Sequence, residues 1–117
     1  YVQERRTFGS LLADHDGVKL KLADMATRLE AARQMTYYAA WCKDQGRGYT
    51  KEAAMAKLFA SEASEFVARE AVQLHGGYGY STEFAVERIY RDQRLMSIGE
   101  GANDVLRLVI GSRVASG

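Results

Sequence analysis

The sequence contains no proline, one cysteine and two histidines. Without proline, helices can run uninterrupted for many turns, because proline removes a backbone hydrogen bond and clashes with the preceding turn. The lone cysteine, Cys42, excludes an internal disulfide and is expected to be a reduced, buried thiol. His15 and His75 are too few and too scattered to form a metal cluster with Cys42, so no metal site is expected.

The chain also lacks a strong charge of either sign and any long apolar run. Its net charge of +1 gives no reason to expect nucleic acid or an anionic membrane as a partner. No stretch reaches the ~18 apolar residues of a membrane-spanning helix, and no signal-peptide pattern opens the chain. With 47% apolar and 26% charged residues, the sequence suits one folded domain, residues 1–117, in a cytoplasmic or organelle-matrix setting. Because it begins at Tyr1 rather than Met, we expect a fragment of a longer protein.

Two long segments carry apolar residues every three or four positions, which predicts amphipathic helices. The first ends near Gly46, and its stripe is Val18, Leu22, Met25, Leu29, Ala32, Met35 and Ala39. The second has Thr50 as its expected N-cap, and its stripe is Ala53, Ala56, Ala60, Ala63, Val67, Ala71 and Leu74. These small side chains predict that a neighbouring helix approaches closely.

Two shorter helices are expected in the last third of the chain. One follows a cap at Ser81 or Thr82, and the other follows Gly101. Residues 1–6 are predicted to be the last turn of a truncated helix that ends at Phe8-Gly9-Ser10. No segment shows sustained two-residue alternation, so no sheet is expected. The predicted fold is therefore all-α, an up-and-down four-helix bundle whose first helix is largely truncated.

Three loops between these helices are the places where ligand chemistry is expected. Glu100 stands between two glycines at the start of a helix, where free N–H groups favour negative charge. The segment 73–80 contains three glycines that allow close contact with a phosphate or a ring. Arg5 and Arg6 beside Phe8 are suited to gripping a phosphate or stacking on a ring. Each loop alone also fits an ordinary turn or helix cap.

Taken together and in order, these segments resemble the C-terminal domain of the acyl-CoA dehydrogenases. Arg5-Arg6-Thr7-Phe8-Gly9 is similar to that family's Arg-x-x-Phe-Gly turn, and Gln73-Leu74-His75-Gly76-Gly77-Tyr78-Gly79 to its Gln-x-x-Gly-Gly-x-Gly segment. Tyr90-Arg91-Asp92 and Glu100-Gly101-Ala102-Asn103 resemble its closing Arg-Asp and Glu-Gly-Thr motifs, and 21–33 its intervening helix. The resemblance covers nearly the whole chain.

The resemblance implies an oxidoreductase that removes hydrogen from the α and β carbons of an acyl-CoA, with FAD as cofactor. It also implies a homodimer or homotetramer, and an electron-transfer flavoprotein as electron acceptor. Glu100 would be the base that takes the α-proton. By the same resemblance, Arg5 and Phe8 would contact the FAD bound by the partner subunit, and Gln73, Gly76 and Gly77 would contact the adenosine–pyrophosphate part of that FAD. Ala102 and Asp104 would contact the FAD of the same subunit. Gly99 and Gly101 would contact the substrate.

Three positions depart from the family pattern. Gly99 stands where many members have tyrosine, Ala102 replaces the common threonine, and Asp16 stands where a glutamine often contacts FAD. Some relatives place their base on the helix that precedes this region. A related flavin oxidase and a non-catalytic helical assembly module therefore remain as alternatives. By itself the chain is expected to be inactive, and acyl chain length is not predicted.

Overall fold

The computed structural model describes all 117 residues, and four α-helices dominate it. They are α1 (Asp16–Asp44), α2 (Thr50–His75), α3 (Ala85–Gln93) and α4 (Asn103–Ala115). Short 3₁₀ helices η1 (Leu12–Asp14), η2 (Gly76–Tyr80) and η3 (Arg94–Ser97) join them. The all-α prediction is confirmed. None of these helices combines the length and apolar character that crossing a membrane requires.

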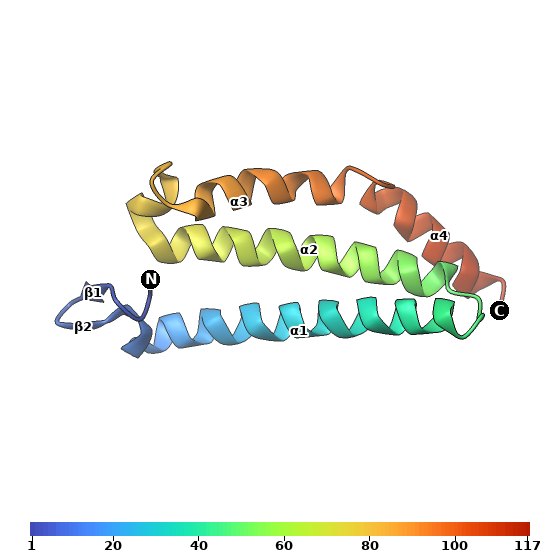
Figure 1. Cartoon of the computed structure of the whole chain (residues 1–117), viewed down its shortest axis with the longest axis horizontal. Helices are drawn as coiled ribbons and strands as arrows, with labels where there is room; N and C mark the ends of the chain where they lie inside the picture. The colour runs from blue at the N-terminus through green and yellow to red at the C-terminus, as the bar shows by residue number, and fades with distance from the viewer.

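The helices lie in three rows. α1 and α2 form a long antiparallel pair, and α3 and α4 follow one another along the other side of α2 (Figure 1). The molecule measures 57 × 24 × 24 Å, with a radius of gyration of 17.5 Å. A compact chain of this length would have a radius of about 13 Å. α2 is therefore the central element, with helices packed on two of its faces, whereas α1 makes most of its contacts with α2.

The helix ends follow the sequence signals only in part. α1 ends at Asp44, and Gly46 follows its cap, as predicted. Gly46 has a φ of 66°, and its N–H donates to Lys43 O while Arg47 N–H donates to Cys42 O, each at 3.0 Å. This is the glycine-terminated pattern that satisfies the last carbonyls of a helix. The predicted cap at Thr50 is wrong by one residue, because Tyr49 occupies the cap position without a side-chain bond.

The predicted cap of α3 is also displaced. The helix begins at Ala85 after Phe84, so neither Ser81 nor Thr82 caps it. Instead, Ser81 Oγ accepts a hydrogen bond from Glu83 N–H at 3.3 Å and closes the turn before the helix. A serine favours such local turns as readily as helix caps, which is why the sequence signal was ambiguous.

Small side chains fill the interface between the rows, as the second stripe predicts. The buried apolar residues are Val18, Ala32, Ala39, Cys42, Ala54, Ala56, Ala63 and Ala68. Cys42 is a free thiol, 2% exposed, as expected. Leu29 is 51% exposed, so the first stripe is wrong at that position. The single neighbour of α1 explains this, because one partner covers only part of a wide apolar stripe.

The N-terminal residues form a hairpin that the sequence did not indicate. Arg5 N–H donates to Tyr1 O at 2.8 Å, which makes one helical turn, and β1 (Arg6–Thr7) then pairs antiparallel with β2 (Ser10–Leu11). The expectation of no sheet is therefore wrong. Phe8 and Gly9 have φ of 50° and 83°, and two consecutive positive values match the tight turn that joins antiparallel strands. Strands of two residues are too short to show alternation.

Candidate functional site

Glu100 lies on the turn between η3 and α4, here called the Glu100 turn (residues 99–101). The cap of α4 is Ala102, so Glu100 lies two residues before the helix cap. Glu100 and Gly101 have φ of 55° and 91°. A left-handed conformation costs a non-glycine residue about 1–2 kcal/mol, and such strain is concentrated at functional sites. The prediction that a glycine beside Glu100 supplies backbone freedom holds at Gly101. The strained left-handed conformation, however, is also adopted by Glu100 itself.

The carboxylate of Glu100 is exposed and makes no hydrogen bond or ion pair with the protein. The backbone N–H groups of Glu100 and Gly101 likewise donate to no group of the chain. An acceptor oxygen and two donors are therefore available to a ligand at the same turn. This combination suits a reaction in which a proton is removed while an adjacent oxygen is stabilised.

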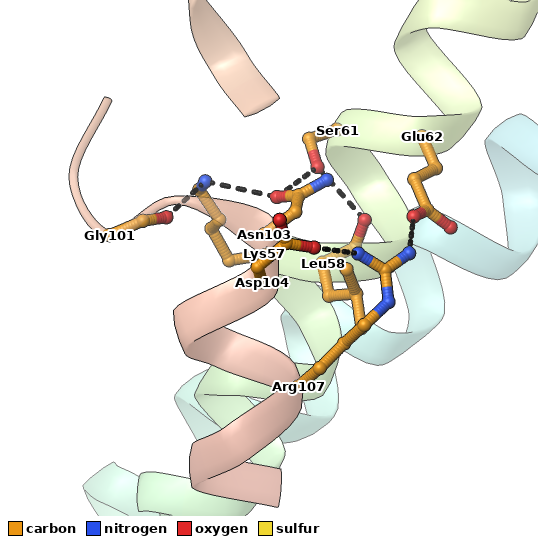
Figure 2. A network of polar contacts seen from close by, with 8 residues as sticks. All are labelled: Lys57, Leu58, Ser61, Glu62, Gly101, Asn103, Asp104 and Arg107. Carbon is orange, nitrogen blue, oxygen red and sulfur yellow. Dashed lines mark hydrogen bonds and ion pairs between the residues drawn. The ribbon is translucent and has the colours of Figure 1, made fainter. Parts of the chain in front are cut away.

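A polar network between α2 and α4 anchors this turn (Figure 2). Lys57 Nζ donates to Gly101 O at 2.7 Å and to Asn103 Oδ1 at 3.3 Å. Ser61 Oγ, one turn further along α2, donates to the same Asn103 oxygen at 3.0 Å. Asn103 is only 8% exposed. The backbone that follows Glu100 is thus held against the central helix.

A second connection lies beside the first. Arg107 of α4 forms an ion pair with Glu62 of α2 and donates to Asp104 Oδ1 at 3.3 Å (Figure 2). Asp104 is highly exposed, so its carboxylate stays accessible at the start of α4. Ala102 and Asp104, both predicted to contact a cofactor, therefore adjoin the Glu100 turn.

The second group of predicted residues lies at the other end of α2. A cleft of about 600 Å³ separates the N-terminal turn from the end of α2 and η2. Its twelve lining residues are Tyr1, Arg5, Thr7, Leu12, Gln73, Leu74, His75, Gly76, Gly77, Tyr78, Ser81 and Glu83. Arg5, Gln73, Gly76 and Gly77 are thereby brought together as the sequence implied. Phe8 does not line this cleft and is 99% exposed at the hairpin tip.

Aromatic and cationic side chains shape this cleft. The rings of Tyr1 and His75 stack with centroids 4.1 Å apart, and Tyr1 Oη donates to His75 O at 3.3 Å. The Arg5 guanidinium lies 5.6 Å from the centroid of the Tyr78 ring. Arg5 has no carboxylate partner and no side-chain hydrogen bond, so its donors are available for an anionic ligand.

The three glycines of this segment have different roles. A Cβ atom added at Gly76 or Gly77 would meet nothing within 4 Å, so both face open space. Gly76 also has a φ of 59° and a ψ of −137°, a conformation that side-chain-bearing residues rarely adopt. A Cβ at Gly79 would lie 2.4 Å from Val72 O, so that glycine is required by packing.

Comparison with known proteins decides the family. The sequence model described as "Acyl-CoA dehydrogenase, C-terminal domain" matches residues 1–115. The chain belongs to the acyl-CoA dehydrogenase family. It is 49% identical over 114 residues to "Probable acyl-CoA dehydrogenase YngJ" of Bacillus subtilis, covering 97% of this chain and 30% of that protein.

Solved structures of the family share the fold. Butyryl-CoA dehydrogenase of Megasphaera elsdenii superimposes with a TM-score of 0.97 at 43% identity, over 98% of this chain and 30% of that one. The FAD complex of PigA gives a TM-score of 0.95 at 30% identity, over 98% of this chain and 30% of that one. The chain therefore spans about 30% of the length of these relatives.

The sequence did not indicate that Lys57 and Ser61 contact the residues after Glu100. Both lie in an alanine-rich stretch of α2, where the predicted stripe drew attention to the apolar residues instead. α2 carries many other polar and charged residues, so nothing local in the sequence set these two apart. Their partner, Asn103, is more than forty positions away in the sequence.

Proposed function

We propose that the protein carrying this domain oxidises the α,β bond of an acyl-CoA thioester, with FAD as cofactor and Glu100 as the catalytic base. The observation that carries the proposal is the free carboxylate of Glu100 on a strained turn beside unpaired backbone N–H groups. Family membership and the order of the three ligand-facing loops support it.

The chemistry fits these groups. An α-proton beside a thioester is weakly acidic, so the base must be within reach while the thioester oxygen is stabilised. The Glu100 carboxylate would take the proton, and the Glu100 N–H would donate to the oxygen. When bound, FAD supplies the acceptor that takes the β-hydrogen as hydride. Gly99 and Gly101 carry no side chain that would hinder a substrate at this turn.

The residues of the cleft suit the phosphate-bearing part of FAD. Arg5 offers an unpaired guanidinium, and Gly76 and Gly77 leave the backbone open to close approach. Gln73 adds an exposed amide at the same cleft. At the other end of α2, Ala102 and Asp104 would line the FAD bound by the same subunit, although Ala102 offers no hydroxyl. Phe8 projects from the chain, which suits contact with the FAD of a partner subunit.

We further propose that the protein is a homodimer or homotetramer and passes electrons to an electron-transfer flavoprotein, in a bacterial cytoplasm or an organelle matrix. Large apolar side chains support an assembly, because Leu20, Leu108 and Val114 are 70%, 72% and 67% exposed. Such surface is usually covered by other protein. Reduced flavin requires an acceptor, and a soluble flavoprotein is the type that the family resemblance implies.

Replacing Glu100 by Gln tests the proposal, because glutamine keeps the size of the side chain but cannot act as a base. The variant should retain FAD and lose turnover of acyl-CoA by at least about a hundredfold, the range in which a positioned base acts. Glu65→Gln, an exposed change on α2, is the matched control and should keep full turnover. Turnover that survives in Glu100→Gln would refute the role of Glu100.

Two alternatives have distinct outcomes in the same preparation. Gly99, Ala102 and Asp16 depart from the family pattern, and these departures support the alternative of an assembly module that has lost catalysis. In that case the unmodified protein would not bind FAD. A flavin oxidase on the same scaffold would instead bind FAD and show rapid reoxidation of the reduced flavin by oxygen.

A further inference from the structure

We propose that Lys57 is a positioning residue that holds the backbone of the Glu100 turn in the geometry that proton abstraction requires. The inference rests on the proposed function of Glu100. Lys57 Nζ reaches from α2 to Gly101 O at 2.7 Å and to Asn103 Oδ1 at 3.3 Å (Figure 2). These contacts join positions that are 44 and 46 residues apart in the sequence.

The partners of Lys57 distinguish it from an ordinary surface lysine. Its ammonium has no carboxylate within ion-pair distance, whereas Lys19, Lys21 and Lys51 each pair with one. The ammonium of Lys57 instead donates hydrogen bonds to a backbone carbonyl and to an amide oxygen. Hydrogen bonds with a charged donor are about twice as strong as neutral ones. The lysine therefore acts on the main chain of the turn rather than on the charge of a neighbouring side chain.

The strained backbone conformation of Glu100 explains why the turn needs the contact with Lys57. A non-glycine residue at a φ of 55° stays in that conformation only when the surrounding structure holds it there. The Glu100 carboxylate makes no hydrogen bond or ion pair, and the N–H groups of Glu100 and Gly101 are unpaired. The carbonyl of Gly101 is the first backbone group after Glu100 that the rest of the protein grips. Removing Lys57 would release the turn at that point.

Ser61 does not duplicate this role. Its single hydroxyl proton is shared between two acceptors, Asn103 Oδ1 at 3.0 Å and Leu58 O at 2.9 Å, and the hydroxyl makes no hydrogen bond to Gly101. Without Lys57, the start of α4 would thus remain attached to α2 through Asn103, while the Gly101 carbonyl would lose its only side-chain donor. The expected consequence is a mobile base on an intact helix pair.

The test uses the full protein with bound FAD and an acyl-CoA in which sulfur replaces the β-carbon. This thioester can lose an α-proton but has no β-hydrogen to transfer as hydride. In D₂O, the base takes the α-proton and a deuteron returns to the carbon, so the exchange rate measured by mass spectrometry reports the base alone. Four proteins form a cycle: wild type, Lys57→Met, Glu100→Gln and the double variant. Lys51→Met is the matched control on the same helix.

Lys57→Met should retain FAD and slow α-exchange by about tenfold to a hundredfold, because a misplacement of about 1 Å can cost that much. In the Glu100→Gln background, the same change should alter the residual rate by less than about twofold. Lys51→Met should exchange at the wild-type rate. The amides of Ile98 and Gly99, which donate to Leu95 O just before the turn, should exchange faster in Lys57→Met, while peptides of α1 stay unchanged.

Unchanged α-exchange in Lys57→Met would overturn the inference. An equal loss with and without Glu100 would also overturn it, since the effect would then be general damage to the fold. Should the methionine variant fail to fold, Lys57→Ala, which also removes the donor to Gly101 O, replaces it in the same cycle, with the same outcomes. Failure of the proposed function is seen separately, because it would leave the exchange rate of the Glu100→Gln single variant at the wild-type value.

Discussion

Two glycines in the segment after α2 should respond in opposite ways to the same substitution. A Cβ atom added at Gly79 would lie 2.4 Å from Val72 O and 3.0 Å from Val72 Cα, both backbone atoms that cannot move independently. An ordinary contact requires about 1 Å more, and overpacking of this kind typically costs about 1–3 kcal/mol. At Gly77 the added atom meets nothing within 4 Å, and the backbone φ is not positive.

Gly77→Ala should therefore leave the fold unchanged, or stabilise it by about 0.4–1 kcal/mol through the unfolded chain. If the cleft holds the phosphates of FAD, however, the new methyl group faces that ligand, and the affinity for FAD should fall. Gly79→Ala should instead lower the local stability first. Amide hydrogen exchange of the peptide covering 70–85 measures the local stability, and titration of the apoprotein with FAD measures the affinity.

The two assays together separate the roles of the two residues. Equal loss of protection in both variants would refute the assignment of Gly79 to packing and Gly77 to ligand approach. Normal protection in Gly79→Ala would show that Val72 can yield, and that the close contact is not a constraint on the fold.

Two further predictions concern charge and backbone strain. The Lys21 ammonium, and to a smaller extent the Arg69 guanidinium, lower the pKa of the buried Glu70 carboxyl. The stabilisation from the ionised carboxylate is therefore complete above the ordinary glutamate pKa of about 4.3 and is lost as the pH falls through the lowered pKa. Lys21→Met should lower the free energy of unfolding by about 1–2 kcal/mol at pH 7, a modest loss because the Lys21 side chain is 42% exposed and solvent screens the pair. The difference in Tm between this variant and the wild type should shrink at pH 3, and a difference that stays constant would contradict the pairing. Phe8→Asn should increase hydrogen-exchange protection of residues 6–11, because asparagine tolerates the φ of 50° found there. The same change should weaken FAD binding about twofold to tenfold in the assembled protein, and unchanged affinity would remove Phe8 from the cofactor site.

The long helices could be predicted because their signal is repeated many times. Each stripe contains seven apolar positions, and the glycine after α1 marks its end directly. The N-terminal hairpin could not, because strands of two residues have no period and a phenylalanine at positive φ is not the residue that such turns favour. The exposure of Leu29 depends on how many neighbours α1 has, which no local pattern contains.

The candidate site divides in the same way. The residues of the Glu100 turn and of the cleft were selected because their motifs, taken in order, resemble those of the acyl-CoA dehydrogenases. Each loop alone also fitted an ordinary turn or helix cap. The contribution of Lys57 depends on a contact with α4, which exists only after two distant segments have packed. Residues that hold a site are therefore harder to find from the sequence than residues that face a ligand.

The central position of α2 limits how this domain can change. Lys57, which contacts the Glu100 turn, and Gln73, at the cleft, are sixteen residues apart on one unbroken helix, or about 24 Å at 1.5 Å per residue. The length of this helix therefore fixes the separation between the two candidate ligand sites. Inserting a single residue would lengthen it by about 1.5 Å and turn one end relative to the other by about 100°. Substitutions along α2 can therefore be tolerated where insertions and deletions cannot.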